Sequence, residues 1–311
     1  MSTITTDRPI SNWTPEELPD LAGKRFIITG GNSGIGFEAA RLLAARGADV
    51  VIAARDAAKG QSALAKIADI GSGTCETLHM NLADMASIRA AAEEAKARFS
   101  NVTVLINNAG VMQTPKAKTA DGFELQLGTN HLGHFLWTAL MIGALDSTEG
   151  RVVTVSSIMH KLGRIDIGNL MLERGYNPNR AYNQSKLANL IFALELHRRL
   201  EAAGSAIRSV ACHPGYSDTP LQSKVHNPLL KLSYSFSNTL FAQPARLGAW
   251  PTALAAADPR AASGGYYGPT GLFDARGPVG ESQIERRARD EATATHLWEA
   301  SEELVSESFA V

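Results

Sequence analysis

A tyrosine and a lysine four residues apart, Tyr182 and Lys186, are the pair in this sequence best suited to proton transfer. On a helix this spacing places both side chains on one face, one turn apart. A free phenol has a pKa near ~10, but a neighbouring cation favours the phenolate and lowers that pKa. The pair is therefore a candidate acid/base, although the same spacing also occurs on helices that only face solvent.

A glycine cluster at residues 29–36, with the sequence TGGNSGIG, is a second candidate. Glycines permit a tight turn and let the backbone approach a pyrophosphate, which then meets the positive end of the helix that begins near Ile35. Because the cluster stands between a predicted strand and a predicted helix, we interpret it as a phosphate site rather than a plain turn.

The residues after the second predicted strand are expected to contact the ribose of a dinucleotide. Asp56 lies about twenty residues beyond Gly36, near the spacing of a carboxylate that binds a 2′-hydroxyl. The strand itself ends at Ala54, so the first polar side chain is Arg55, whose forked donors suit a 2′-phosphate. A solvated turn or a helix cap is the alternative for Arg55 and Asp56.

A regular alternation of strands and helices must position these groups. Apolar runs predict strands at residues 25–29, 50–54, 76–80, 102–106, 151–155, 207–211 and 265–267. Helical spacing predicts helices at residues 35–46, 57–70, 85–99, 122–145, 180–203, 244–257 and 283–301. The pattern predicts an α/β fold with a single doubly wound (Rossmann) parallel sheet of about seven strands and helices on both faces.

The same pattern indicates the domain organisation. Residues 1–23 are expected to form an N-terminal arm that Trp13 and Leu18 attach to the body. Residues 24–311 are expected to form one catalytic domain with a substrate loop at 220–243 and a C-terminal helix, because no linker interrupts the alternation.

Ligands of open parallel sheets bind at the carboxyl ends of the strands, and unusual residues follow three of the predicted strands there. They are Asn107, Asn108, Ala109 and Gly110 after the fourth strand, Ser156 and Ser157 after the fifth, and His213, Pro214 and Gly215, then Thr219, after the sixth. The two asparagines can stabilise the sheet edge or form the floor of an adenosine site, and both roles stay open.

Composition excludes several classes of protein. The chain has 311 residues, 44% of them hydrophobic and 20% charged, as in soluble globular proteins. A net charge of -1 argues against a nucleic-acid partner or an anionic membrane surface. No apolar run reaches the ~20 residues of a membrane span and no signal pattern opens the chain, so we expect a cytoplasmic protein. We interpret Cys75 and Cys212 as buried free thiols, and leave a homo-oligomer open.

Taken in order, these motifs resemble the classical short-chain dehydrogenase/reductase family over residues 23–267. The matching residues are Thr29, Gly30, Gly34, Ile35 and Gly36, then Asn107, Asn108, Ala109 and Gly110, then Asn130, Ser157, Tyr182, Lys186, Pro214, Gly215 and Thr219. Residues 127–135 and 182–189 are most similar to the retinol-dehydrogenase-like and carbonyl-reductase branch of that family.

The resemblance implies a role for each catalytic candidate. Tyr182 would be the general acid/base, and Lys186 would lower its pKa and bond the nicotinamide ribose. Ser157 would bond the substrate oxygen. Asn130 would hold a water in a proton relay through Lys186.

The resemblance also implies a nicotinamide cofactor. Thr219 would bond the nicotinamide carboxamide, and Arg55 implies NADP(H) in preference to NAD(H), which stays an alternative. The implied cofactor-binding residues are Gly30, Asn32, Ser33, Gly34, Ile35, Gly36, Arg55, Asn81, Leu82, Asn108, Ala109, Gly110, Tyr182, Lys186, Pro214, Gly215 and Thr219. Three features depart from the family. Asn81 and Leu82 stand where an acidic residue is usual, and Asn32 and Ser33 where a basic one is. Residues 160–179 form an insertion between Ser157 and Tyr182 that is expected to cover the active site.

Apolar and aromatic residues near the strand ends suggest a hydrophobic substrate mouth, although ordinary loop packing explains them equally well. They are Met112, Met159, Tyr216, Tyr234 and Phe236. Residues 220–243 are longer than an ordinary connection and are predicted to form a lid. His131 and His134 have a spacing that suits metal ligands, but no Cys, Asp or Glu cluster joins them, so we interpret both as packed and expect no metal.

The sequence therefore predicts an NADP(H)-dependent oxidoreductase that interconverts an alcohol and a hydrophobic ketone or aldehyde, with that small molecule as its partner. One alternative is a non-catalytic dinucleotide-sensing or scaffold protein on the same fold. Another is an epimerase or dehydratase that uses the Tyr182 and Lys186 pair and returns the cofactor unchanged.

Overall fold

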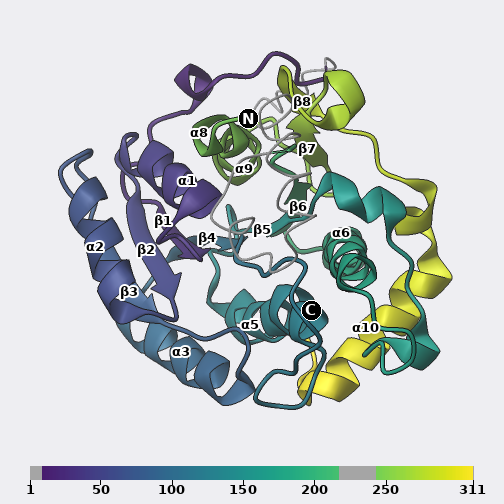
Figure 1. Ribbon diagram of the computed structural model, residues 1–311. Coiled ribbons are helices and arrows are strands. Elements are labelled where there is room, and N and C mark those ends of the chain that lie inside the picture. Colours follow the sequence, from purple (N-terminus) through teal and green to yellow (C-terminus); the bar gives the residue numbers. More distant parts are fainter. Residues whose placement is uncertain (1–8, 217–242, 311) are drawn as a thin grey trace.

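Eight strands form one sheet in the computed structural model, which describes residues 9–216 and 243–310 (Figure 1). They are β1 Arg25–Thr29, β2 Asp49–Ala54, β3 Cys75–His79, β4 Val102–Asn107, β5 Arg151–Val155, β6 Arg208–Cys212, β7 Tyr266–Pro269 and β8 Val279–Glu281. Their order across the sheet is β3-β2-β1-β4-β5-β6-β7-β8. Every neighbouring pair from β3 to β7 is parallel, which confirms the predicted doubly wound sheet.

The eighth strand is the one that the sequence pattern did not indicate. β8 has three residues with Gly280 at its centre, so it presents no apolar run. It pairs antiparallel with β7 at the edge of the sheet. The predicted number of strands is therefore one too small.

Helices cover both faces of the sheet (Figure 1). They are α1 Gly34–Ala44, α2 Ala57–Ile67, α3 Met85–Arg98, α4 Leu125–Leu127, α5 Gly133–Met141, α6 Pro178–Ala202, α8 Ala245–Gly248, α9 Trp250–Ala257 and α10 Glu291–Val305. In β1, Phe26 and Ile28 pack with the α1, α2 and α9 side, whereas Ile27 packs with the α3 and α5 side. The central strands β4 and β5 are buried along their whole length because helices cover both faces, whereas the edge strand β3 is fully buried only at Leu78.

The helix predicted over residues 122–145 is interrupted, and that prediction is wrong. A π-helical turn, Gly128–Leu132, lies between α4 and α5. Gly133, directly after this turn, lies so close to the loop between β3 and α3 that a Cβ on it would be 2.5 Å from the Leu82 carbonyl oxygen. Such turns insert one residue into the helical repeat and are frequent at functional sites. This one carries Asn130.

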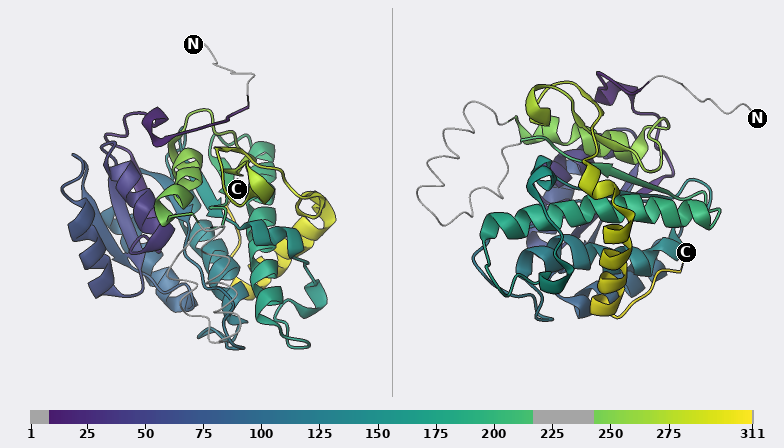
Figure 2. Two further views of the ribbon diagram at one scale, coloured as in Figure 1. Left: turned by 45° about the horizontal axis from the view of Figure 1, so that its top comes forward. Right: turned by 90° about the vertical axis from the view of Figure 1, so that its right-hand side faces the viewer.

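The two longest late helices cross one another, as Figure 2 shows for α6 and α10. An aromatic cluster joins them to α5, with the ring centroids of Trp298 and Phe309 4.5 Å apart and those of Phe135 and Trp298 5.1 Å apart. α10 begins at Glu291 and not at the predicted residue 283, because the Asp290 side chain caps it by accepting from the Thr293 N–H at 2.8 Å.

The described part of the N-terminal arm packs on the sheet edge, as its apolar residues predict. Trp13 and Leu18 are buried, and the Trp13 Nε1–H donates to Asp258 at 2.7 Å. The Trp13 backbone N–H also donates to the Val279 carbonyl in β8 at 2.9 Å. Both cysteines are free, with Cys212 buried as predicted and Cys75 only half-buried. No helix within the described ranges is long and apolar enough to cross a bilayer.

Candidate active site

The glycine loop between β1 and α1 leaves room for a ligand at the helix end. Gly30 and Gly34 have φ angles of +67° and +55°, which glycine adopts without strain. A Cβ at Gly36 would lie 2.4 Å from the Asn108 amide nitrogen and 2.6 Å from the Gly30 carbonyl oxygen. Ser33 precedes α1 and makes no side-chain cap, so the first N–H groups of the helix stay available. The residues present therefore fit a dinucleotide phosphate.

Tyr182 and Lys186 lie on the first turns of α6. The side chain of Asn177 caps this helix by accepting from the N–H groups of Asn179 and Arg180. The Lys186 ammonium lies 5.9 Å from the centroid of the Tyr182 ring. It donates to the Val155 carbonyl at 3.0 Å.

Burial controls the charge of Lys186. The side chain is buried, and this burial lowers the pKa of Lys186 to about 8. No carboxylate in the described residues forms an ion pair with it. With a pKa of about 8, Lys186 keeps its proton at neutral pH. It can therefore act as a cation beside the Tyr182 phenol.

The serine pair after β5 has divided roles. The Ser156 hydroxyl donates to the Lys186 backbone carbonyl at 2.7 Å and so fixes α6 on the end of β5. The Ser157 oxygen accepts from the Met159 N–H at 3.2 Å and caps the 3-10 helix Ile158–Leu162. The Ser157 hydroxyl keeps its own hydrogen to donate to a ligand oxygen.

A cleft of about 710 Å³ lies at the carboxyl ends of the strands and joins these groups. The predicted site residues that line it are Gly30, Asn32, Ser33, Gly34, Ile35, Gly36, Arg55, Asn81, Leu82, Asn108, Ala109, Gly110, Met112, Ser157, Met159, Tyr182, Lys186, Pro214, Gly215 and Tyr216. The volume is in the range of ~300–1,000 Å³ that ligand sites occupy.

Comparison with known proteins agrees with this arrangement. The family model described as short chain dehydrogenase matches residues 24–229, which is more than half of the chain. The chain belongs to the short-chain dehydrogenase family. Retinol dehydrogenase 12 of Homo sapiens is 42% identical over 289 residues, which cover 92% of this chain and 87% of that protein. The predicted likeness to the retinol-dehydrogenase-like branch is thus confirmed.

Two solved structures share the fold of this short-chain dehydrogenase. A putative uncharacterized protein from Mycobacterium paratuberculosis is 42% identical with a TM-score of 0.81, covering 96% of this chain and 99% of that one. A blue fluorescent protein from a metagenomic library, in complex with NADPH, is 25% identical with a TM-score of 0.63. It covers 79% of this chain and 96% of its own.

In this short-chain dehydrogenase the residues that follow β2 line one end of the cleft, and Arg55 is the cation among them that has no partner within the described residues. Asp56 caps α2 by accepting from the Lys59 N–H at 3.0 Å, and it forms an ion pair with the Lys59 ammonium. Arg55 lines the cleft and has no hydrogen bond or ion pair with any described residue. The capping alternative therefore applies to Asp56 but not to Arg55. Lys59, which the sequence reasoning missed, adds a second positive charge to the same wall.

The two asparagines after β4 have different partners. Asn107 is fully buried and donates to Thr138 at 2.9 Å, so it supports the sheet. Asn108 lines the cleft and donates to the Thr29 carbonyl at 2.8 Å, so it both fixes the glycine loop and forms the cleft wall. Asn81 also lines the cleft, and its side-chain oxygen accepts from the Ala83 N–H at 3.2 Å.

Asn130 lies behind the cleft rather than in its wall. Its amide accepts from the Val111 N–H at 2.7 Å and donates to the Val111 carbonyl at 2.9 Å and to Ser185 at 2.9 Å. A Cβ on Gly110 would lie 3.0 Å from the Asn130 oxygen and 3.7 Å from the Lys186 ammonium. Gly110 therefore separates these two side chains, and no described hydrogen bond joins them directly.

His134 is a part of the site framework whose role the sequence reasoning did not identify. Its Nδ1 lies 2.9 Å from the Asn130 carbonyl, and its Nε2 lies 2.8 Å from the Thr29 hydroxyl. A carbonyl only accepts, so Nδ1 carries the hydrogen and Thr29 donates to Nε2. Burial lowers the pKa of His134 to about 4, which keeps the ring neutral. Only the position of His134 four residues after Asn130 could have indicated this link.

The remaining predicted residues fall into two groups. His131 packs in the interior with its Nε2 2.9 Å from the Ser301 hydroxyl, in line with the packing interpretation. No group of three metal-binding side chains is present in the part of the chain that the structure describes. Thr219, Tyr234, Phe236 and all but the last residue of the predicted lid at 220–243 lie outside the described residues.

Proposed function

We propose that this short-chain dehydrogenase is an NADP(H)-dependent oxidoreductase that interconverts an alcohol and a hydrophobic ketone or aldehyde. The observation that carries the proposal is one cleft lined by the glycine loop, Tyr182 and a buried Lys186. A phosphate-binding end and a proton-transfer pair in the same cleft are what such a reaction requires. A nicotinamide bound in that cleft supplies the hydride.

The side chains of the cleft account for the proton. In the reducing direction Tyr182 donates to the developing alkoxide, and the Lys186 cation stabilises the phenolate that remains. Ser157 donates a hydrogen bond to the same oxygen. We propose that a water held near Asn130 returns a proton through Lys186 to the Tyr182 phenolate, so that Lys186 gives up one proton and takes up another; Asn130 and Lys186 both lie next to Gly110.

The preference for a 2′-phosphate rests on the wall formed by Arg55 and Lys59. Arg55 is uncommitted, and its planar fork matches a phosphate. Asp56 is engaged by the α2 cap and would repel a phosphate less than a free carboxylate. A structural neighbour in complex with NADPH supports this choice of cofactor. We propose that Thr219 contacts the nicotinamide carboxamide.

A hydrophobic substrate suits the other end of the cleft. Met112, Ile158, Met159 and Tyr216 line it. The relative named retinol dehydrogenase 12 suggests a long unsaturated alcohol or aldehyde as the substrate class. Flexible thioether side chains such as those of the two methionines adapt to irregular apolar shapes.

A cofactor-depletion screen tests the proposal. NADPH absorbance is followed with retinal and with steroid, aromatic and aliphatic carbonyls, and the products are identified by mass. We expect NADPH loss equal to alcohol formation, fastest with a long apolar aldehyde. Substrate turnover without net loss of NADPH would indicate an epimerase or dehydratase. NADPH binding without turnover of any panel member would indicate a non-catalytic sensor.

A further inference from the structure

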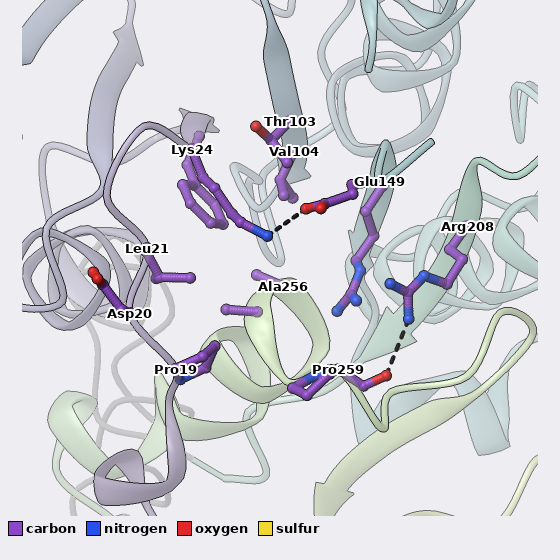
Figure 3. A pocket seen from close by; sticks show the side chains of 13 residues that line it. Pro19, Asp20, Leu21, Lys24, Thr103, Val104, Glu149, Arg208, Ala256 and Pro259 are labelled. Atoms are coloured by element: carbon purple, nitrogen blue, oxygen red, sulfur yellow. Dashed lines mark hydrogen bonds and ion pairs between the residues drawn. The ribbon is translucent and has the colours of Figure 1, made fainter. Parts of the chain in front are cut away.

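A second pocket, of about 300 Å³, lies near the amino ends of the strands, opposite the cleft. Figure 3 shows the side chains that line it. Its wall includes the first residues of β5 and β6, residues near the starts of β1 and β4, the end of α9 and the described arm. The cleft, in contrast, is lined by residues at and beyond the carboxyl ends of the strands. The two sites therefore cannot share a ligand.

Strand register orders the side chains along one wall of this pocket. Phe26 pairs with Val104, Val104 with Arg151, and Arg151 with Arg208 across β1, β4, β5 and β6. Aligned residues of parallel strands share a face of the sheet. The wall is therefore apolar at one end and carries two adjacent guanidinium groups at the other.

Neither arginine has a carboxylate partner within the described residues. Arg151 is buried and uses only Nη1, which donates to the Ala255 carbonyl at 2.7 Å and to the Asp258 carbonyl at 3.2 Å. Arg208 also uses only Nη1, which donates to the carbonyls of Pro259 and Ala261, each at 3.2 Å. Each guanidinium has five N–H donors, so most of them stay unused in both side chains.

The carboxylates in or beside the pocket are already committed to other donors. Asp20, which lines the pocket, accepts from the Ala22 N–H at 3.0 Å. Glu149 forms an ion pair with Lys24, as Figure 3 shows. Asp258 accepts from Trp13 and Arg260. Burial, followed by the repulsion of Arg208, lowers the pKa of Arg151 to about 9. The charges of Asp258 and Glu149 oppose this shift but do not cancel it.

We propose that this pocket binds a small amphiphilic carboxylate, with the carboxylate between Arg151 and Arg208 and the apolar body against Phe26 and Val104. The free N–H groups of the two guanidiniums match the planar oxygens of a carboxylate. Leu21 and Ala256 complete the apolar end (Figure 3). Inorganic phosphate shares the charge of the ligand but leaves that apolar end unfilled.

Calorimetric titration with hexanoate, acetate, hexanol and inorganic phosphate tests this site, using the full chain with and without saturating NADPH. We expect hexanoate to bind most tightly, with an affinity that NADPH does not reduce. Because a charge-assisted contact is lost, Arg208→Gln should weaken hexanoate by about tenfold or more. The matched control is Arg25→Gln, which removes an arginine at the start of β1 that pairs with Asp49 outside the pocket.

Arg151→Lys gives a second test that keeps a donor for the α9 carbonyls, and it should also weaken hexanoate. Thermal unfolding confirms that each variant folds. The proposal is overturned if hexanol binds as tightly as hexanoate, if phosphate alone binds, or if NADPH displaces hexanoate. It is overturned equally if no probe binds, since both arginines would then serve only to cap α9 and its following loop.

Discussion

Lys186 and Arg151 are two buried cations at opposite ends of the strands, Lys186 beside the carboxyl end of β5 and Arg151 at its amino end, and each is 4% exposed. Each donates to backbone carbonyls, Lys186 to Val155 and Arg151 to Ala255 and Asp258. Burial lowers the pKa of Lys186 to about 8 and that of Arg151 to about 9. The two residues thus share the same degree of burial and bond to the same kind of acceptor, but they lie in different pockets.

The difference between them lies in what stands beside each cation. Lys186 has the Tyr182 ring at 5.9 Å, so its charge acts on a group that can exchange a proton. Arg151 has Arg208 as its strand neighbour, and neither side chain can release a proton near neutral pH. In the two proposals made above, each of these cations faces a ligand, and its neighbour determines whether the site performs chemistry.

Removing the Lys186 charge should have the largest effect. Lys186→Met keeps the length of the side chain but leaves the Tyr182 phenolate without a cation, so we expect kcat to fall by roughly 10²–10⁴. Steady-state kinetics with the best carbonyl of the screen measure this. A variant with kcat close to that of the wild type would show that Lys186 is, like Arg151, outside the chemistry.

Arg55→Ala tests the cofactor end of the cleft. We expect NADPH affinity to fall by the ~1.5–3 kcal/mol of a charge-assisted contact, with little change for NADH. Fluorescence titration of both cofactors measures the difference. Arg41→Ala is the control, because Arg41 pairs with Glu38 on α1 outside the cleft. Equal losses for NADPH and NADH would place the recognition of the 2′-phosphate elsewhere.

Arg151→Met tests how much Arg151, at the amino end of β5, contributes to the free energy of unfolding. Pro259 has no N–H to complete the end of α9, so the Ala255 carbonyl depends on Arg151. We expect the free energy of unfolding to fall by about 1–3 kcal/mol, measured by urea denaturation. Lys186→Met should cost less, because the Val155 carbonyl keeps the Asn189 amide as a donor at 3.2 Å. A larger loss of unfolding free energy in Lys186→Met than in Arg151→Met would show that Arg151 is not needed to complete the end of α9.

The pH dependence of stability separates the Lys186 charge from its packing. Burial lowers the pKa of Lys186 in the folded chain to about 8, below its usual 10.5, so between these values the unfolded chain binds more protons. Stability of the wild type relative to Lys186→Met should therefore rise with pH in that window, by about 1 kcal/mol between pH 8 and pH 9, because Lys186 is half protonated at pH 8 in the folded chain. Urea unfolding at pH 8 and pH 9 measures it. Parallel pH dependences in the two proteins would mean that Lys186 titrates normally.

The fold was predictable where the residues alternate in a regular pattern. Strands such as β1 and β4 are unbroken apolar runs, and glycines or caps bound them. β8 was missed because three residues around Gly280 carry no period and depend on pairing with β7. The π turn at Gly128–Leu132 was missed because helical residues precede and follow it directly, and the close approach of Gly133 to the Leu82 carbonyl is visible only in the fold.

The candidate site was predictable where a local motif carries the chemistry, as with the glycine loop and the Tyr182 and Lys186 pair. The roles of His134 and Lys59 were not, because each depends on a partner brought close by the fold. The pairing of Arg151 with Arg208 was hidden for the same reason. Two arginines so far apart in sequence meet only through strand register.

The central claim is that Tyr182 transfers the proton in a cleft that binds NADPH, and Tyr182→Phe tests it most directly. The substitution removes one hydroxyl and keeps the ring beside Lys186. We predict that turnover of the best carbonyl is abolished while NADPH affinity changes by no more than about tenfold, the upper end for one hydrogen bond. A variant that binds NADPH and keeps a near-normal kcat would show that Tyr182 does not transfer the proton.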